Sequence, residues 1–344
     1  MSRTRHTVAH RCRSSTSVIV ARPQPPGACR EVQEAAVFTV IGEALIDLVQ
    51  AEPGGAYVAR PGGGPLNVAV ALRRLGHQTE LMARLSDGSL GDVVRRHAEH
   101  NRLGLSAGVS SPAQATLALA TLDPAGQASY DFYVNGTADW GWTSEELAGI
   151  PASTRVLHTG SLAAAIEPGA GAVLGRVEWL HAAGGVLVSY DPNVRPTLAG
   201  DRAEAVVRVE RFVAAAHVVK ASDDDIGWLY PEAAAVDVLT HWLGLGAELV
   251  VMTRGAAGWL AVKGTSPPVE AAAPTVRVVD TIGAGDAFMA GLLSGLADGG
   301  CVEPGSVGAM PERVLTSVLH RAALVSALTC GRAGADPPTR EELG

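Results

Sequence analysis

The chain has 344 residues, of which 47% are apolar and 18% are charged, and its formal net charge is −8. This length suits one large α/β domain or two ordinary ones, with enough apolar residues to bury a sizeable core. An acidic chain is a poor candidate for a nucleic-acid binder, and no apolar run approaches the roughly 18 residues that cross a bilayer. We therefore expect a cytoplasmic protein with neither a nucleic-acid nor a membrane partner.

The first residues differ in composition from the rest of the chain. Residues 1–30 contain six arginines and no acidic residue. The apolar stretch at 18–21 is too short for the core of a signal peptide. We expect a disordered basic tail over residues 1–35, either native or the product of an incorrectly assigned start, and a folded domain over residues 36–344.

Short β-type segments dominate the first part of this domain. Residues 37–41 predict a buried strand, and the glycine-rich segment 62–67 leads into a predicted helix over 68–75 that Gly76 ends. Two hairpins are predicted where β-type segments flank turn residues: 46–50 and 56–60 around Pro53–Gly55, and 115–122 and 128–134 around Asp123–Gly126. Two hairpins in an otherwise alternating chain predict a small sheet attached to the main domain.

From about residue 150, strand-like and helix-like segments alternate regularly. Such alternation with short loops implies an α/β fold, in which a parallel sheet carries helices on both faces. Strands are predicted near 155–159, 185–190, 217–220, 248–253, 258–262 and 275–278, and helices near 170–183, 201–215, 223–245, 283–297 and 311–330.

The segment with the strongest chemical signal is Asp-Thr-Ile-Gly-Ala-Gly-Asp-Ala-Phe at residues 280–288. Gly283, Ala284 and Gly285 let the backbone approach a ligand closely, and they open a helix whose free N–H groups bind anions. Asp286 lies in the first turn of that helix, where the dipole favours the ionised form that a general base requires. Taken alone, the pattern also fits a glycine-rich helix start with Asp as a capping residue.

The nine residues together resemble the C-terminal signature of the ribokinase/PfkB family of sugar kinases, and the resemblance extends over about residues 37–340. It implies a ribokinase-like three-layer α/β/α fold with a mostly parallel central sheet and a small β-sheet lid, with strands at approximately 45–61 and 113–135. It also implies an ATP-dependent kinase in which Asp286 deprotonates a sugar hydroxyl and the backbone of 283–286 forms an anion hole. Lids of this family often pair between subunits, so we expect a homodimer.

The expected sugar site comes from the N-terminal half. Residues 62–69 resemble the family's Gly-Gly-x-Pro-x-Asn motif, which holds the sugar, and Asp47 matches an early Asp that bonds sugar hydroxyls. A loop with an Asn near a helix start, and an exposed acid near a turn, are the alternative interpretations. The resemblance assigns six residues to the sugar: Asp47, Gly63, Gly64, Asn67, Arg195 and Asp286.

The expected nucleotide site comes from the C-terminal half. Residues 253–258 resemble the family's Thr-x-Gly motif, and Arg254 either adds charge at the phosphates or lies on the surface. Residues 220–225 align with a segment carrying Asn-x-x-Glu, which organises Mg²⁺ through water, with Ser222 and Asp225 in place of Asn and Glu. A helix N-cap is the alternative interpretation. The residues assigned to ATP are Lys220, Ser222, Thr253, Arg254, Gly255, Gly258, Gly283 and Gly285.

A second cation is implied at Asp280. This residue and the backbone near Ile282 resemble the family's monovalent-cation loop, which residues 330–335 would close. A K⁺ requirement is a hypothesis from this resemblance. The implied cofactors are therefore ATP and Mg²⁺, with K⁺ as a further candidate.

Several stretches most resemble fructokinases, including residues 190–196 with Asp-x-Asn-x-Arg. That pattern also occurs in 2-keto-3-deoxygluconate kinases, where the Arg binds the substrate carboxylate. Both subfamilies often carry an arginine after the aromatic pair of the lid, whereas Val134 follows Phe132 and Tyr133 here. A missing cation matters less for a neutral ketose than for a sugar acid. Fructose is therefore favoured, with sugar acids, ribose and nucleosides as alternatives.

Two functions of other classes compete with a sugar kinase. A dinucleotide-dependent oxidoreductase needs GxGxxG directly after the first strand, but residues 62–64 do not follow it directly and Pro65 breaks the pattern. A sugar-binding homologue without activity fits the altered Ser222 and Asp225. The retained Asp286 argues against it.

Overall fold

The computed structural model describes residues 37–50, 52, 54–122 and 128–344. Its central sheet has eight strands in the order β14-β13-β12-β11-β10-β9-β1-β4. β13 pairs antiparallel with β12 and with β14, and the other neighbouring pairs are parallel. The strands are β1 (Val37–Ile41), β4 (Gln78–Met82), β9 (Thr154–Gly160), β10 (Leu187–Asp191), β11 (Val218–Ser222), β12 (Leu249–Thr253), β13 (Trp259–Lys263) and β14 (Val269–Ala271).

Helices cover both faces of this sheet and bury two separate cores. Because successive side chains of a strand point to opposite faces, Phe38 and Val40 join one core and Ile41 joins the other. The helices of the first core are α1 (Gly64–Arg74), α2 (Ser89–His100), α9 (Ala284–Asp298) and α10 (Glu312–Cys330). Those of the second are α3 (Ser144–Leu147), α4 (Gly169–Ala183), α6 (Arg202–Ala214), α7 (Asp223–Leu229) and α8 (Ala235–Leu245). The prediction of a three-layer α/β/α fold is confirmed.

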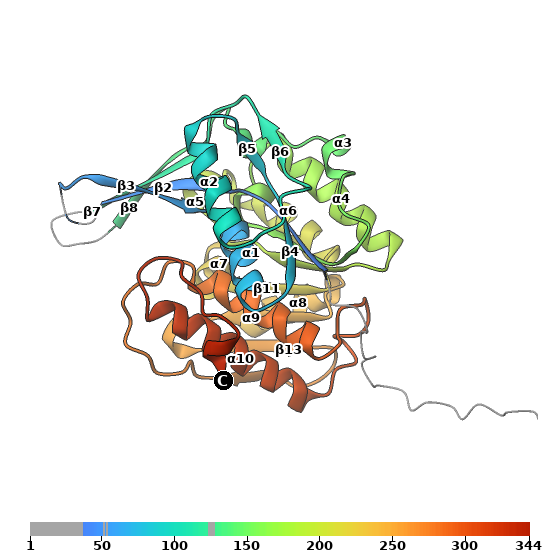
Figure 1. Ribbon diagram of the computed structural model, residues 1–344. Helices are drawn as coiled ribbons and strands as arrows, with labels where there is room; N and C mark the ends of the chain where they lie inside the picture. Colours follow the sequence, from blue (N-terminus) through green and yellow to red (C-terminus); the bar gives the residue numbers. More distant parts are fainter. Residues whose placement is uncertain (1–36, 51, 53, 123–127) are drawn as a thin grey trace, which may run out of the picture.

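A separate four-stranded sheet projects from one side of this body (Figure 1). The pairs β2–β3 and β7–β8 are antiparallel hairpins, and β2 joins them by pairing parallel with β7. Both predicted hairpins are confirmed, although Pro53 and most of the second turn lie outside the described residues, as does the predicted tail. The strands are β2 (Leu45–Gln50), β3 (Tyr57–Gly62), β7 (Leu117–Leu122) and β8 (Ala128–Tyr133).

The prediction of a strand at 275–278 is wrong. The edge of β13 is occupied by β14 instead, and the chain then leaves the sheet before Pro274. Val276 and Val278 line a cavity, so their alternating apolar pattern serves a cavity wall and not a strand.

Residues 77–112 carry no element predicted from the sequence, yet they form β4, α2 and a small parallel sheet of β5 (Arg84–Ser86) and β6 (Val109–Ser111). In α2, Val94 and Ala98 are buried and Leu90 and Val93 pack against the same core, a spacing of i, i+3, i+4 and i+8 that indicates a helix. Within the described parts of the chain, no helix has both the length and the apolar character needed to cross a membrane.

Candidate active site

The carboxyl ends of the parallel strands meet at one edge of the central sheet. In open α/β sheets, ligands bind in the crevice outside these ends. The side chains that gather there are Glu43 after β1, Ser161 after β9, Asn193 after β10, Ser222 at the end of β11 and Thr253 at the end of β12. The helices α1 and α9 begin at the same edge.

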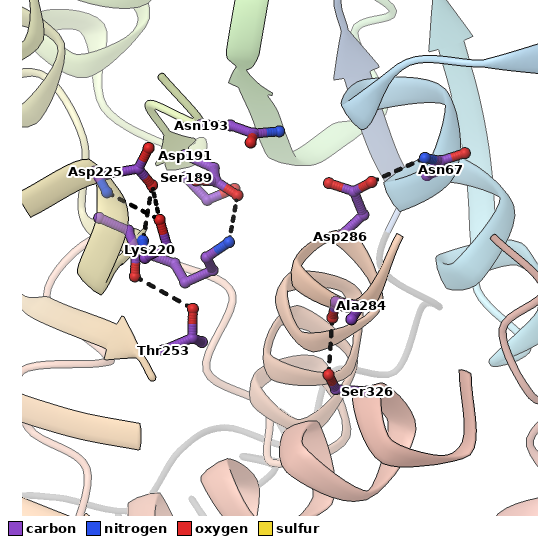
Figure 2. A network of polar contacts seen from close by, with 12 residues as sticks. Asn67, Ser189, Asp191, Asn193, Lys220, Asp225, Thr253, Ala284, Asp286 and Ser326 are labelled. Carbon is purple, nitrogen blue, oxygen red and sulfur yellow. Dashed lines mark hydrogen bonds and ion pairs between the residues drawn. The ribbon is translucent and has the colours of Figure 1, made fainter. Parts of the chain in front are cut away.

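The start of α9 holds the predicted catalytic segment. Gly283 is the N-cap with a φ of 74°, and a Cβ added there would lie 2.6 Å from the Cβ of Ala335. Both the left-handed backbone and the close approach require glycine. Asp286 lies in the first helical turn, and its Oδ2 accepts a 2.8 Å hydrogen bond from Asn67 Nδ2 at the start of α1 (Figure 2). The fold therefore joins two predicted motifs that are 219 residues apart.

The ionisation of Asp286 depends on opposing effects. Burial raises the pKa of this carboxyl, although the hydrogen bond from Asn67 and the charges of Lys220 and Arg195 lower it. Desolvation outweighs these contacts, so the net direction is upward, and the expected favourable effect of the helix dipole on the ionised form stays a prediction. A carboxylate with a raised pKa binds a proton more strongly, which suits a general base.

A cavity of about 870 Å³ opens on the Asp286 side of the α9 start, and we call it the larger cavity. Its wall combines residues of the central sheet, of α1 and of the projecting sheet. All six residues assigned to the sugar line it, namely Asp47, Gly63, Gly64, Asn67, Arg195 and Asp286. Their contact with a sugar stays a prediction.

Asp47 points from β2 into the larger cavity. Gly62, which lies on the adjacent strand β3 and pairs with Leu45, leaves the space that this carboxylate occupies, since a Cβ there would lie 2.0 Å from Asp47 Oδ2. Burial raises the pKa of Asp47 to about 6, against the opposing charge of Arg195. Arg195 donates from Nη1 to Asn193 Oδ1 at 2.7 Å, which fixes the guanidinium at the cavity wall.

Three further residues of this wall were not predicted from the sequence. Ser161 and Asn193 have positive φ values of 54° and 39°, a conformation that non-glycine residues rarely adopt and that clusters at functional sites. Glu43 is 1% exposed, accepts a hydrogen bond from Ala163 N at 3.1 Å, and has a pKa that burial raises to about 7. The position of Glu43 directly after the first strand could have indicated from the sequence that it lies at the ligand-binding edge of the sheet.

A buried ion pair faces the α9 start from the sheet. Lys220 Nζ lies 2.7 Å from Asp191 Oδ2, and both residues are 3% exposed. A Cβ on Gly285 would lie 3.1 Å from the same ammonium, so Lys220 points toward the predicted anion hole (Figure 2). Burial lowers the pKa of Lys220, but Asp191 more than reverses this, and the ammonium stays charged. Burial raises the pKa of Asp191 to about 6, which leaves it ionised at neutral pH.

Ser222 and Asp225 form a capping box at the start of α7. Asp225 Oδ2 accepts from Ser222 N at 2.7 Å, and Asp225 Oδ1 accepts from Val194 N at 2.7 Å. The helix-cap interpretation is therefore correct. Both carboxylate oxygens already have donors, which fits an ion held through water better than a direct ligand. Among the residues that the structure describes, no three His, Cys, Asp or Glu side chains are grouped to hold a metal ion.

A second cavity of about 460 Å³, the smaller cavity, lies on the other side of the α9 start. Four of the residues assigned to ATP line it: Thr253, Gly255, Gly258 and Gly285. Arg254 is directed elsewhere, since it pairs with Glu270 at 2.9 Å and donates to the carbonyl of Trp259. Ser326, on α10, donates to the carbonyl of Ala284 at 2.9 Å and ties the wall of this cavity to α9 (Figure 2).

The loop that contains Asp280 is joined to the C-terminal segment, as predicted. Asp280 Oδ1 accepts from Ile282 N at 3.0 Å, and Oδ2 accepts from Gly334 N at 2.8 Å. The carbonyl of Cys330 accepts from Val279 N at 2.8 Å. A carboxylate and carbonyl oxygens on adjoining loops are ligands of the type that a hard cation prefers.

Comparisons with known proteins agree with this geometry. A family model described as pfkB family carbohydrate kinase matches residues 37–342. A fructokinase of Rhizobium leguminosarum bv. trifolii is 33% identical over 281 residues, which cover 80% of this chain and 84% of the relative.

Among solved structures, an ATP-bound fructokinase of Xylella fastidiosa superposes with a TM-score of 0.81 at 27% identity, covering 89% of this chain and 96% of that one. A fructokinase variant of Vibrio cholerae O395 with bound fructose, ADP and potassium gives a TM-score of 0.78 at 27% identity, covering 90% and 97%.

Proposed function

Because this chain belongs to the pfkB family of carbohydrate kinases, we propose that it transfers the γ-phosphoryl group of ATP to the 6-hydroxyl of fructose, with Asp286 as the general base. The observation that carries the proposal is the position of the α9 start. It lies between a larger cavity that is rich in hydrogen-bonding side chains and a smaller, apolar one. A sugar in the first and ATP in the second would meet at Asp286.

The proposed reaction is an in-line displacement. Asp286 accepts the proton of the sugar hydroxyl, whose oxygen bonds to the γ-phosphorus while the bond from that phosphorus to the β–γ bridging oxygen breaks, releasing ADP. Negative charge on the transferring group is stabilised by the backbone N–H groups of Gly283 and Gly285 at the α9 start and by the ammonium of Lys220, whereas Ala284 N already donates to the carbonyl of Thr281. Asn67 holds the Asp286 carboxylate in place through their 2.8 Å hydrogen bond.

ATP binding is proposed to depend on two different environments. Adenine would occupy the apolar wall formed by Val276, Phe288 and Ala327, and the phosphates would approach Thr253 and the start of α9. Mg²⁺ bound to the phosphates would neutralise their charge, and Asp225 would hold its waters. Asp280 with the carbonyl of Cys330 would hold K⁺ and so stabilise the loop before the anion hole.

A neutral sugar fits the charge of the larger cavity. Five acidic side chains line it, whereas Arg195 is the single cationic side chain among the described residues of its wall. This excess of carboxylates disfavours a sugar acid, and Asp47 and Asp286 in particular provide acceptors for hydroxyl groups. The relatives that are named fructokinase support fructose among the neutral sugars. The alternatives are 2-keto-3-deoxygluconate kinase and ribokinase-type activities, or a sugar-binding homologue without turnover.

A screen of sugars at fixed ATP tests this proposal. ADP release is measured with fructose, ribose, a nucleoside and 2-keto-3-deoxygluconate, and each phosphorylated product is identified by mass. We expect the highest kcat/KM with fructose. A higher kcat/KM with 2-keto-3-deoxygluconate would show that this sugar acid, and not fructose, is the substrate. The absence of turnover with every sugar would reject the kinase assignment.

A further inference from the structure

Several passages of the chain connect the main domain to the projecting sheet at one place. The chain enters β2 after Ala44 and enters β7 after Thr116, and it leaves β8 toward the short helix η1 (Ala138–Trp140). Two of these entries lead directly to residues of the larger cavity, since Asp47 follows Ala44 by three positions and Ala118 follows Thr116 by two. The orientation of these passages therefore decides where that cavity wall lies.

A single buried carboxylate links these passages. Asp139 Oδ1 accepts from Ala44 N at 2.9 Å, and Asp139 Oδ2 accepts from Thr116 Oγ1 at 2.6 Å. Asp139 itself belongs to η1, the segment by which the chain leaves β8. Its side chain is 1% exposed, and it is not among the described residues that line the larger cavity.

Further contacts attach this linkage to the main domain. Thr116 Oγ1 also lies 2.6 Å from Thr137 Oγ1, and Ala138 N donates to the carbonyl of Gln114 at 2.9 Å. Arg84, which follows β4 of the central sheet, donates from Nε to the carbonyl of Ala138 at 2.9 Å and pairs with Glu146 of α3. The carboxylate is therefore held against the body and in turn holds the strands of the projecting sheet.

Apolar packing encloses the same point. Leu45 and Ala118 of the projecting sheet contact Trp140, Leu162 and Ala163 of the body in one small buried cluster. Such packing is not directional, whereas hydrogen bonds to a charged acceptor fix both distance and angle. Asp139 is the group at this junction that can set the angle between the sheet and the body.

We infer that Asp139 is a positioning residue for phosphoryl transfer, which holds the projecting sheet at the angle that brings Asp47 and Ala118 against the bound sugar and keeps water away. The inference rests on the proposed function. Asp139 touches neither sugar nor ATP and acts through Ala44 and Thr116. A correctly placed sheet lowers the KM for the sugar and prevents transfer of the phosphoryl group to water.

Asp139→Asn tests this role with little change of volume. The amide oxygen can still accept from Ala44 N, but the amide nitrogen can only donate, so the charge-assisted bond from Thr116 Oγ1 is replaced by a neutral bond in the reverse direction. We expect the sugar KM to rise by about tenfold or more, while the KM for ATP changes by less than about twofold. The ADP formed per sugar phosphate should exceed one, because a displaced sheet admits water. A protein that is only less stable would show neither change below its unfolding temperature.

Thr116→Val provides a second route to the same result. It removes the hydroxyl that donates to Asp139, retains the shape of the side chain, and should raise the sugar KM and the ADP ratio in the same direction. The matched control is Asp201→Asn. Asp201 is an exposed carboxylate that caps α6 by accepting from Glu204 N, and this variant should show the sugar KM and the ADP ratio of the unaltered protein. Unchanged sugar KM and ADP ratio in folded Asp139→Asn or Thr116→Val would overturn the inference. Absence of sugar turnover in the unaltered chain would reject the proposed function and this inference with it, whereas normal turnover there with no change in either variant would overturn the inference alone.

Discussion

The larger and smaller cavities lie on either side of the same helix start but are built from different kinds of residue. The larger one draws its wall from residues 43–286, across both sheets, and carries five carboxylates and one guanidinium. The smaller one draws its wall from residues 253–330 alone, and no charged side chain of the described residues lines it.

The difference indicates two mechanisms of recognition. Hydroxyl groups need acceptors at defined positions, which fixed carboxylates provide, and burial raises the pKa values of Asp47 and Asp286 in this wall. A planar base is held mainly by burial of apolar area, for which small side chains suffice. Changes to single charges should therefore affect the sugar side far more than the nucleotide side.

The largest expected effect comes from the carboxylate between the cavities. Asp286→Asn removes the proposed base but keeps the size of the side chain and its ability to form hydrogen bonds. We therefore expect kcat to fall by about 10²–10⁴ while both substrates still bind. Steady-state kinetics and calorimetric binding measure the two quantities. Asp298→Asn, at the other end of α9, is the control and should be near normal. Turnover within a few-fold of normal in Asp286→Asn would exclude it as the base.

The next effect concerns the buried pair that faces the anion hole. Lys220→Met removes one stabilising charge, and we expect kcat to fall by about 10²–10³. It also leaves Asp191 buried without its partner, which costs about 3–5 kcal/mol of unfolding free energy.

Combining Lys220→Met with Asp191→Asn separates the loss of turnover from the loss of stability. The double variant should regain much of the unfolding temperature and none of the turnover. Recovery of turnover together with stability would mean that Lys220 has only a structural role.

A smaller effect is expected where the larger cavity binds hydroxyl groups. Asp47→Asn weakens hydrogen bonds to a charged acceptor, which are worth about 1.5–3 kcal/mol, so the sugar KM should rise by about 10- to 100-fold. The KM for ATP should stay unchanged, because Asp47 lines only the larger cavity. Asp131→Asn, an exposed carboxylate on β8, serves as the control. An equal rise of both KM values would contradict the separation of the cavities.

The pH dependence should follow the carboxylates of the larger cavity. The pKa of Asp47 is about 6, so Asp47 gains a proton as the pH falls through that value, and burial also raises the pKa of Asp286 above its ordinary value. Since the protonated forms can no longer accept a hydroxyl proton, kcat/KM for the sugar should fall at least about tenfold per pH unit below that point. Asp47→Asn should shift this acid limb. If kcat/KM of the unaltered protein began to fall only near pH 4, burial would not have raised the pKa values of these carboxylates.

The smallest effect is expected on the nucleotide side. Arg254→Ala breaks an exposed pair with Glu270, and exposed pairs are worth about 0–1 kcal/mol. The KM for ATP should therefore change by less than about fivefold, as kinetics at saturating sugar would measure. A much larger rise would mean that Arg254 leaves Glu270 to bind the phosphates, and that the smaller cavity also depends on a charge.

Local patterns were sufficient to predict most elements of the fold. The alternation after residue 150 predicted the parallel sheet and its helices, because burial on both faces of a strand and on one face of a helix leaves distinct periodicities. The pattern was ambiguous where apolar residues line a cavity, as at Val276 and Val278. In α2, by contrast, the spacing of Leu90, Val93, Val94 and Ala98 is that of an amphipathic helix, and the predictions lacked this element although its signal was present.

The sequence by itself determined the nature of the segment at 280–288 that we propose to be catalytic and of the loop at 62–67 that we propose to bind the sugar, since glycine, asparagine and aspartate at these spacings carry their chemistry within a few residues. Only the tertiary structure decided which distant groups act on it. Asn67 reaches Asp286, Lys220 faces Gly285, and Asp139 holds the strand that carries Asp47. These contacts join residues from separate strands and helices, and they depend on the order and register of the sheet, which no local pattern records.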